Sequence, residues 1–214
     1  MEGKKKAIIL DLDNTVYPVS SIGKQLFSDL FDMIQQDGRY QGSFEDVKQA
    51  IQRKPFQVVA DEFSFHEELT SRGLEALSDL EYKGEMKAFD DYALIRGFPQ
   101  MKFLVTTGFT KLQWSKIRQL NLETDFDACF VVDPAKSSKT KKDIFAEIMS
   151  SYGLSAEELL VVGDDIHSEI KAGKELGIET VLYDFASKYI ELPDYTDYII
   201  TNFSELGRHL EGVA

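Results

Sequence analysis

Cysteine is nearly missing from this sequence: among 214 residues the only one is Cys129, and histidine occurs three times. A single cysteine cannot form an intramolecular disulfide, and no cysteine–histidine group has the spacing of a structural zinc site. A fold held by internal disulfides and a domain stabilised by a structural zinc site are therefore both excluded. Such cysteine usage is typical of a reducing compartment, so we expect the protein in the cytoplasm.

Basic residues are also scarce, with 24 Lys and Arg against 37 Asp and Glu, a formal charge of −13. This negative field repels phosphate backbones, so we expect neither nucleic acids nor anionic membranes as partners. Long apolar runs are missing as well. Only Ala7 to Leu10 follow the charged start, too few for a signal peptide, and no run approaches the roughly 20 apolar residues of a membrane span. We therefore expect a soluble intracellular protein.

The sequence does contain a series of short, continuously apolar runs with helical patterns between them. They are Ala7 to Leu10, Phe103 to Thr106, Ala128 to Val132, Leu159 to Val162, Thr180 to Leu182 and Tyr198 to Ile200. Continuously apolar runs indicate strands buried on both faces, as in a parallel sheet covered by helices. The sequence therefore predicts an α/β fold with a doubly wound, Rossmann-like parallel sheet.

The first two runs are separated by residues 17–97, far more than a simple crossover needs. The pattern there predicts amphipathic helices at Val19–Gln36, Phe44–Arg53, Gln57–Ser71, Leu74–Tyr82 and Met86–Arg96. The last of them is expected to return the chain to the sheet. We therefore expect a core made of residues 1–16 and 98–214, and an α-helical insertion at residues 17–97 that includes the return helix.

Polar side chains follow three of the predicted strands. Asp11 and Asp13 come directly after the first run, Thr106 ends the second, and Asp164 and Asp165 follow the fourth. Because the carboxyl ends of parallel strands share one edge of a sheet, we expect these side chains to converge. Several acids placed together repel unless a cation joins them, and oxygen ligands of this kind suit Mg²⁺. A carboxylate at this edge can also act as a nucleophile and form an aspartyl-phosphate.

An anionic nucleophile that attacks a phosphate needs a positive charge nearby. The segment after the third run supplies four lysines, Lys136, Lys139, Lys141 and Lys142. Position alone does not select one of them, and lysines at the start of a helix most often form a solvated face.

Four motifs of this sequence, in this order, resemble those of the haloacid dehalogenase-like superfamily, whose members are mostly Mg²⁺-dependent phosphatases. The motifs are Asp11-Leu12-Asp13-Asn14-Thr15, Thr106, Lys139 and Gly163-Asp164-Asp165. Any one of them alone is weak, but four in order are specific. The resemblance covers residues 6–16 and 98–210, and it implies that the insertion is a helical cap of the first type.

Carried over residue by residue, the resemblance implies a role for each motif. Asp11 would be the nucleophile and a metal ligand, and Asp13 would be the general acid/base, with its backbone carbonyl on the metal. Thr106 would hydrogen-bond the transferring phosphoryl group, and Asp164 would complete the metal site. Lys139 would neutralise the phosphoryl group, because the family's lysine normally lies five positions before the Ile of an Ile-Phe pair.

Four neighbouring residues are weaker candidates for contact with the substrate: Asn14, Thr107, Asp165 and Glu169. Asn14 replaces the frequent Gly of the first motif, Thr107 stands where many relatives have Asn, and Glu169 stands where an Asp is common. Glu169 is a candidate to orient the metal shell. His167 is a candidate to face the site as an acid/base group.

The resemblance implies a Mg²⁺-dependent phosphatase that acts on a small phosphorylated metabolite, such as a sugar phosphate or a nucleoside monophosphate, through an aspartyl-phosphate on Asp11. A helical cap excludes bulk water and restricts such a site to small molecules. Two alternatives stay open: a phosphomutase or dehalogenase on the same scaffold, and a non-catalytic protein that binds phosphorylated metabolites. Asp13 favours phosphate esters over dehalogenation, because a leaving halide needs no proton.

Overall fold

The computed structural model describes residues 5–52 and 54–211, and its centre is a six-stranded sheet with the strand order β3-β2-β1-β4-β5-β6. All neighbouring strands pair in parallel. The strands are β1 (Ala7–Leu10), β2 (Met101–Thr107), β3 (Ala128–Val132), β4 (Leu159–Gly163), β5 (Glu179–Tyr183) and β6 (Tyr198–Ile200). This confirms the predicted fold class, and each strand contains the apolar run from which it was predicted.

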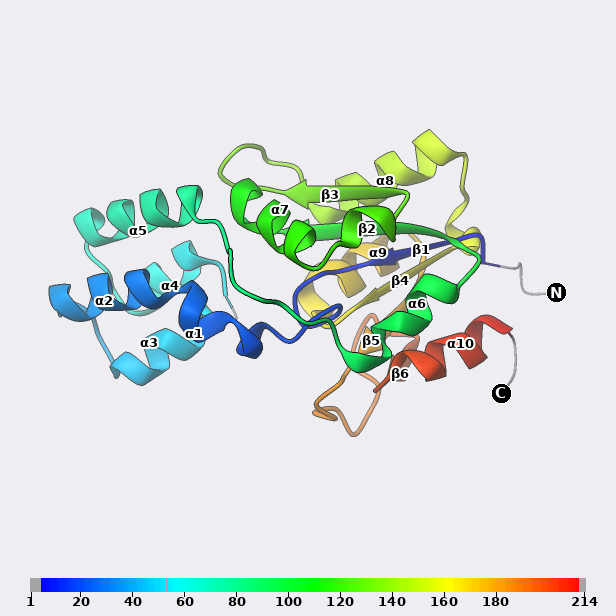
Figure 1. Cartoon of the computed structure of the whole chain (residues 1–214). Coiled ribbons are helices and arrows are strands. Elements are labelled where there is room, and N and C mark those ends of the chain that lie inside the picture. Colours follow the sequence, from blue (N-terminus) through cyan, green and yellow to red (C-terminus); the bar gives the residue numbers. More distant parts are fainter. Residues whose placement is uncertain (1–4, 53, 212–214) are drawn as a thin grey trace.

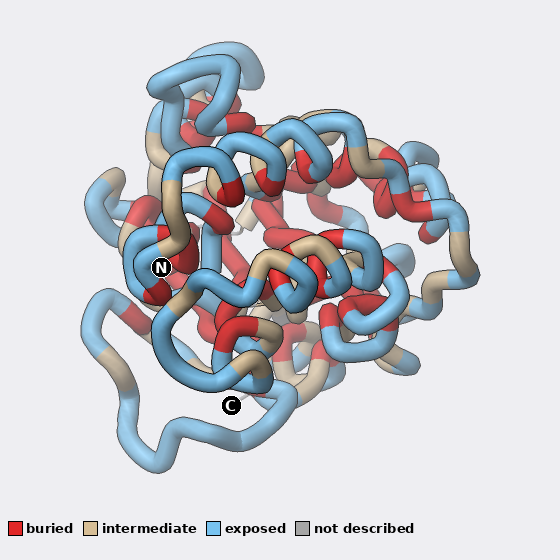
Figure 2. Tube along the Cα trace, turned by 90° about the vertical axis from the view of Figure 1, so that its left-hand side faces the viewer, coloured by how far each residue is buried: buried red, intermediate tan, exposed pale blue. Residues whose placement is uncertain are grey.

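Helices cover both faces of the sheet. On one face lie α6 (Ala93–Gly97), α7 (Thr110–Gln119) and α10 (Phe203–Glu211), and on the other lie α8 (Lys141–Tyr152) and α9 (Lys171–Glu175). Successive residues of β1 point to opposite faces of the sheet. Ile8 and Leu10 pack in the apolar cluster that includes α6, α7 and α10, and Ala7 and Ile9 pack in the cluster that includes α8 and α9. All four are buried, which explains why the run is continuously apolar. Figure 2 shows the buried positions in the interior and the exposed positions on the outer turns of the helices.

Helices inserted between β1 and β2 form a separate layer toward which the carboxyl ends of the strands point (Figure 1). They are α1 (Gly23–Leu26), α2 (Ser28–Asp37), α3 (Phe44–Ile51), α4 (Phe56–Glu62) and α5 (Glu67–Asp79). The buried side chains of α2 to α5, from Leu30 to Leu77, form an apolar cluster of their own. By contrast Tyr82, Tyr92 and Ile95 pack in the cluster of the sheet, so the return segment lies on the core.

The insertion differs in detail from the helices predicted for it. The helix expected at 57–71 is two helices, because Ser64 adopts a left-handed φ of 55° and His66 then caps the start of α5. The helix expected at 86–96 is only a 3-10 turn, Asp90–Tyr92, followed by the short α6. Arg53, the expected end of another helix, lies outside the described residues. Within the described ranges, no helix combines the length and apolarity that crossing a membrane requires.

Candidate active site

Asp11 lies where the strand order of the sheet reverses. Its β1 is flanked by β2 and β4, which is the position where open parallel sheets bind ligands beyond their carboxyl ends. The backbone N–H of Asp11 donates to the carbonyl of Val162 at 3.0 Å, and this bond continues the β1–β4 pairing up to the site. The residue is 6% exposed. The sheet therefore holds this carboxylate rigidly at its edge.

Three carboxylates meet at this edge: Asp11 after β1, Asp164 after β4, and Glu169 from the π-helical turn Ile166–Ile170. One oxygen from each lies within 4.8 Å of the others. Burial, together with the neighbouring carboxylates, raises the pKa of Asp164 to about 8, and burial raises that of Asp11 to about 7 although a lysine lies beside it. The electrostatic repulsion between carboxylates this close is reduced when a divalent cation binds between them. Their oxygen-only donor set fits Mg²⁺.

The lysine that the structure places beside Asp11 is Lys141, not Lys139, the lysine predicted from the motif. The Lys141 ammonium lies 2.6 Å from Asp11 Oδ1 and 2.6 Å from Glu169 Oε2, and its side chain is 7% exposed. Burial alone would lower its pKa, but Asp11 and Glu169 outweigh this effect and raise it. Lys139 instead donates to Glu147 at 2.5 Å, and its side chain is 54% exposed.

The physical reason lies in the start of α8. Thr140 caps this helix in a capping box with Asp143, so Lys139 precedes the helix and Lys141 is its first residue. Helical spacing then places Lys141 on the same face as Ile144 and Ile148, which pack against the sheet. This periodicity is present in the sequence and would have selected Lys141.

Thr106 and Thr107 end β2 beside β1. Thr106 is buried, and its hydroxyl oxygen accepts a hydrogen bond from the Gln113 side-chain amide at 2.5 Å. Thr107 is exposed, and its backbone carbonyl accepts from the same amide at 3.2 Å. Of these two threonines, Thr106 is therefore the one whose hydroxyl is held by a hydrogen bond at the edge of the sheet.

Asp13, whose side chain is 28% exposed, is contacted by side chains that sequence reasoning did not select. Lys116 Nζ lies 2.8 Å from its Oδ1 and 3.2 Å from its Oδ2, and Gln113 donates to Oδ2 at 2.8 Å. The Tyr17 hydroxyl also donates to Oδ1. Burial alone would raise the pKa of Asp13, but Lys116, Tyr17 and Gln113 together lower it. The sequence signal was weak: Gln113 and Lys116 share one helix face directly after the Thr106 motif.

The remaining predicted residues hold the local backbone. Asn14 adopts a left-handed φ of 58°, and its side chain accepts from the backbone N–H of Val19 at 3.1 Å. The Asp165 side chain caps the π-helical turn by accepting a hydrogen bond from the backbone N–H of His167 at 2.8 Å. The backbone N–H of Asp165 donates to the Glu169 carboxylate at 2.8 Å. Asp165 and His167 are both exposed. Substrate contact by Asn14, Thr107 or Asp165 stays a prediction.

Gly163 leaves the space that Glu169 occupies. A Cβ at this position would overlap the Glu169 carboxyl group. Gly163→Ala should therefore displace Glu169 and lower the free energy of unfolding by about 1–3 kcal/mol, the usual cost of overpacking. Chemical denaturation of the metal-free protein measures this loss. Gly97→Ala is the matched control, since a Cβ there has open space around it. Equal stability of Gly163→Ala and the wild type would show that Glu169 can move away at little cost.

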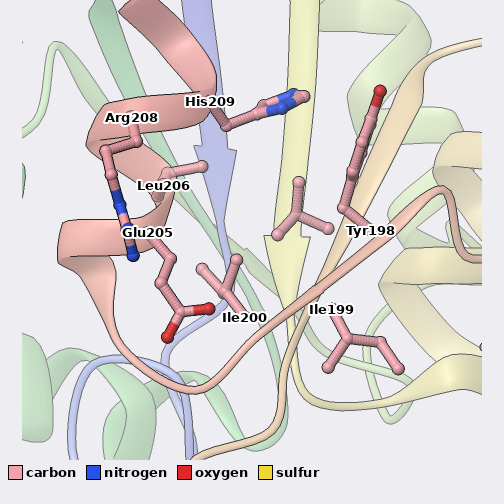
Figure 3. Close-up of a pocket in the computed structure, with 8 residues that line it drawn as sticks. Tyr198, Ile199, Ile200, Glu205, Leu206, Arg208 and His209 are labelled. Atoms are coloured by element: carbon pink, nitrogen blue, oxygen red, sulfur yellow. The ribbon is translucent and has the colours of Figure 1, made fainter. Parts of the chain in front are cut away.

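A pocket of about 240 Å³ lies elsewhere, between β6 and α10 (Figure 3). Its lining includes Tyr198, Ile200, Glu205, Arg208 and His209. None of the acidic cluster belongs to this lining, and His209 is already engaged with Glu179 at 2.7 Å. The chemistry therefore points to the strand ends around Asp11 as the candidate active site.

Comparison with curated proteins finds phosphatases. The chain is 32% identical over 115 residues to glyceraldehyde 3-phosphate phosphatase of Pyrococcus furiosus, a match over 52% of this chain and 48% of that enzyme. The chain thus spans about half the length of this relative. It is 24% identical over 202 residues to ribulose-1,5-bisphosphate 5-phosphatase of Halopiger xanaduensis, covering 83% of this chain and 84% of that enzyme.

Solved structures share the fold over nearly the whole chain. A haloacid dehalogenase-like hydrolase from Streptococcus pneumoniae superposes with a TM-score of 0.73 at 16% identity, covering 96% of this chain and 98% of that one. YfnB from Bacillus subtilis, a putative hydrolase bound to magnesium, has a TM-score of 0.66 at 17% identity, covering 97% and 99%. The sequence pattern of the haloacid dehalogenase-like hydrolases matches residues 5–177. The chain therefore belongs to the haloacid dehalogenase-like hydrolase family.

Proposed function

We propose that this protein is a Mg²⁺-dependent phosphatase that hydrolyses a small phosphorylated metabolite through an aspartyl-phosphate on Asp11. The observation that carries the proposal is the arrangement around Asp11. A buried carboxylate at the sheet edge touches the Lys141 ammonium, shares its surroundings with Asp164 and Glu169, and is followed two residues later by Asp13. The phosphatase names of the relatives support the same reading.

Asp11 and Lys141 would carry the first step. An Asp11 carboxylate oxygen attacks phosphorus as the ester oxygen leaves, forming an acyl phosphate. Lys141, held 2.6 Å from Asp11, offsets the charge of the phosphoryl oxygens, while the Thr106 hydroxyl orients one of them. Positioning and charge neutralisation dominate phosphoryl transfer, and here buried groups provide both.

Asp13 would serve both steps as acid and then base. In its protonated form the Asp13 carboxyl group gives a proton to the leaving alcohol, and the resulting carboxylate takes one from the water that hydrolyses the acyl phosphate. A dehalogenase has no need of the first proton transfer. A phosphomutase could use both, so this alternative is decided by whether inorganic phosphate is released.

The candidate metal ligands are the side chains of Asp11, Asp164 and Glu169, together with the backbone carbonyl of Asp13. The first three have carboxylate oxygens within reach of one ion. A bound Mg²⁺ supplies positive charge that keeps the carboxylates ionised and neutralises the phosphoryl oxygens. Glu169 also accepts from Lys141 at 2.6 Å, which ties the lysine to the acidic cluster.

Substrate class and metal dependence are tested together with a panel of phosphorylated metabolites. Sugar phosphates, triose phosphates and nucleoside monophosphates are assayed for phosphate release with Mg²⁺, then after chelation, and again after Mg²⁺ is restored. We expect hydrolysis of at least one group, loss on chelation and recovery with Mg²⁺. Full activity in verified metal-free protein would contradict the metal assignment. A panel that is bound but never hydrolysed would favour the non-catalytic alternative.

Binding of Mg²⁺ should weaken as the pH is lowered. In the metal-free protein the pKa of Asp11 is raised to about 7 and that of Asp164 to about 8. Protons therefore occupy these carboxylates near neutral pH and must leave when the ion binds, so affinity falls as pH falls through these values. Isothermal titration calorimetry in buffers of different ionisation enthalpy should detect this proton release. Binding at pH 7 without release would contradict it.

A further inference from the structure

The Asp13 carboxylate is held by side chains from two separate segments. Lys116 and Gln113 come from α7, and Tyr17 comes from the loop after β1. Together they contact both carboxylate oxygens of Asp13. Both torsions of the Asp13 side chain are therefore constrained by groups 100 and 103 residues away in the sequence.

These partners are buried, so water cannot take their place. The Lys116 side chain is 6% exposed, Gln113 is 1% exposed, and Tyr17 is fully buried. A lysine with so little exposure is costly unless it is paired. Asp13 is the one carboxylate within ion-pair distance of Lys116 in the part of the chain that the structure describes. The burial of Lys116 is therefore compensated at Asp13.

Gln113 connects Asp13 to the neighbouring strand end. Its amide donates to Asp13 at 2.8 Å and to the Thr106 hydroxyl oxygen at 2.5 Å. Gly108, with a φ of 151°, leaves room for this side chain, since a Cβ there would lie 3.1 Å from it. The orientation of Asp13 is thus fixed relative to Thr106, the group proposed to contact the phosphoryl oxygens.

We propose that Lys116, supported by Gln113, is a positioning residue that orients the Asp13 carboxylate for the reaction. Lys116 acts through Asp13 and does not itself contact the substrate. The inference rests on the proposed acid/base role of Asp13. A purely structural alternative is that Lys116 only fastens α7 to the loop after β1, and the two differ in how the effect of Lys116 depends on Asp13.

A double-mutant cycle separates them. Lys116→Met should lower kcat by about tenfold to a hundredfold, the scale of a small misplacement of a reacting group, and should change KM by less than about threefold. In an Asp13→Asn background the same change should lower kcat by less than about threefold, because the group that Lys116 orients is already inactive. Lys111→Met is the matched control on α7, since Lys111 is exposed and pairs with Asp79, and kcat should stay within about twofold.

Crystal structures of the same variants provide a readout that does not depend on turnover. In Lys116→Met the Asp13 carboxylate should leave Gln113, whereas Thr106 should stay in place. Losses in kcat that multiply in the double variant, or an Asp13 that keeps its orientation, would overturn the inference. If Lys116→Met did not fold, Gln113→Leu would undergo the same cycle and crystallography. A wild-type protein without phosphatase activity would refute the proposed function, while the crystal structure would still decide whether Lys116 orients Asp13.

Discussion

Asp11→Asn should abolish the covalent intermediate and reduce turnover by about 10⁴-fold or more, the scale seen when a nucleophile is removed. Asparagine has nearly the size of aspartate, so the buried site should keep its packing. The amide oxygen is a poor nucleophile, however, and cannot form an acyl phosphate. Rapid quenching with a good substrate, followed by mass spectrometry, should find phosphate on Asp11 in the wild type and none in the variant.

Two comparisons make this result specific. Asp13→Asn should lose about 10²- to 10⁴-fold in turnover, the range of a general acid or base. Asp90→Asn is the surface control, since Asp90 is exposed and pairs with Lys87, and it should behave as the wild type. Phosphate found on another residue, or turnover retained by Asp11→Asn, would contradict the nucleophile assignment.

Lys141→Met should reduce turnover by about a hundredfold or more, the usual scale for losing one group that stabilises developing charge. The variant keeps the length of the side chain but leaves Asp11 and Glu169 without their shared ammonium. Phosphate transfer to Asp11 then has to proceed against uncompensated negative charge. Single-turnover kinetics at saturating Mg²⁺ measure this step directly, and circular dichroism shows whether the protein is folded.

Lys139→Met is the matched control. Lys139 lies only two residues away, but it is half exposed and bonded to Glu147. An exposed pair of this kind contributes little, so turnover should stay within about twofold of the wild type. A more damaging effect at Lys139 than at Lys141 in folded protein would show that Lys139, the lysine predicted from the motif, neutralises the phosphoryl group.

The sheet was predictable because its signal is local. Each strand of a covered parallel sheet is buried on both sides, so the run is continuously apolar and recognisable without knowledge of its neighbours. The limits of β1, β3 and β6 equal those of the runs from which they were predicted. The insertion was harder, because one left-handed residue, Ser64, divides a pattern that reads as a single helix. Backbone breaks of this kind depend on packing as well as on residue type.

The acids of the site were predictable from topology. Once the strands are parallel, Asp11 and Asp164 must end at the same edge, and the structure brings them together with Glu169. That placement follows from chain direction alone. Their roles in catalysis stay proposals until the variants are measured.

The fold family, the sheet edge that carries the acids, and Asp11 as the first carboxylate beyond β1 could all be predicted from the sequence alone. Which cations lie beside these acids depends on how the helices pack on the sheet. For Lys141 the sequence holds a local signal, because Thr140 sets the phase of α8, but the contact of Lys141 with Asp11 forms only when α8 packs on the sheet. Lys116 reaches Asp13 only after α7 packs beside the loop that follows β1. An ion pair between residues 103 apart leaves no local pattern, because its geometry exists only when both segments are packed on the sheet.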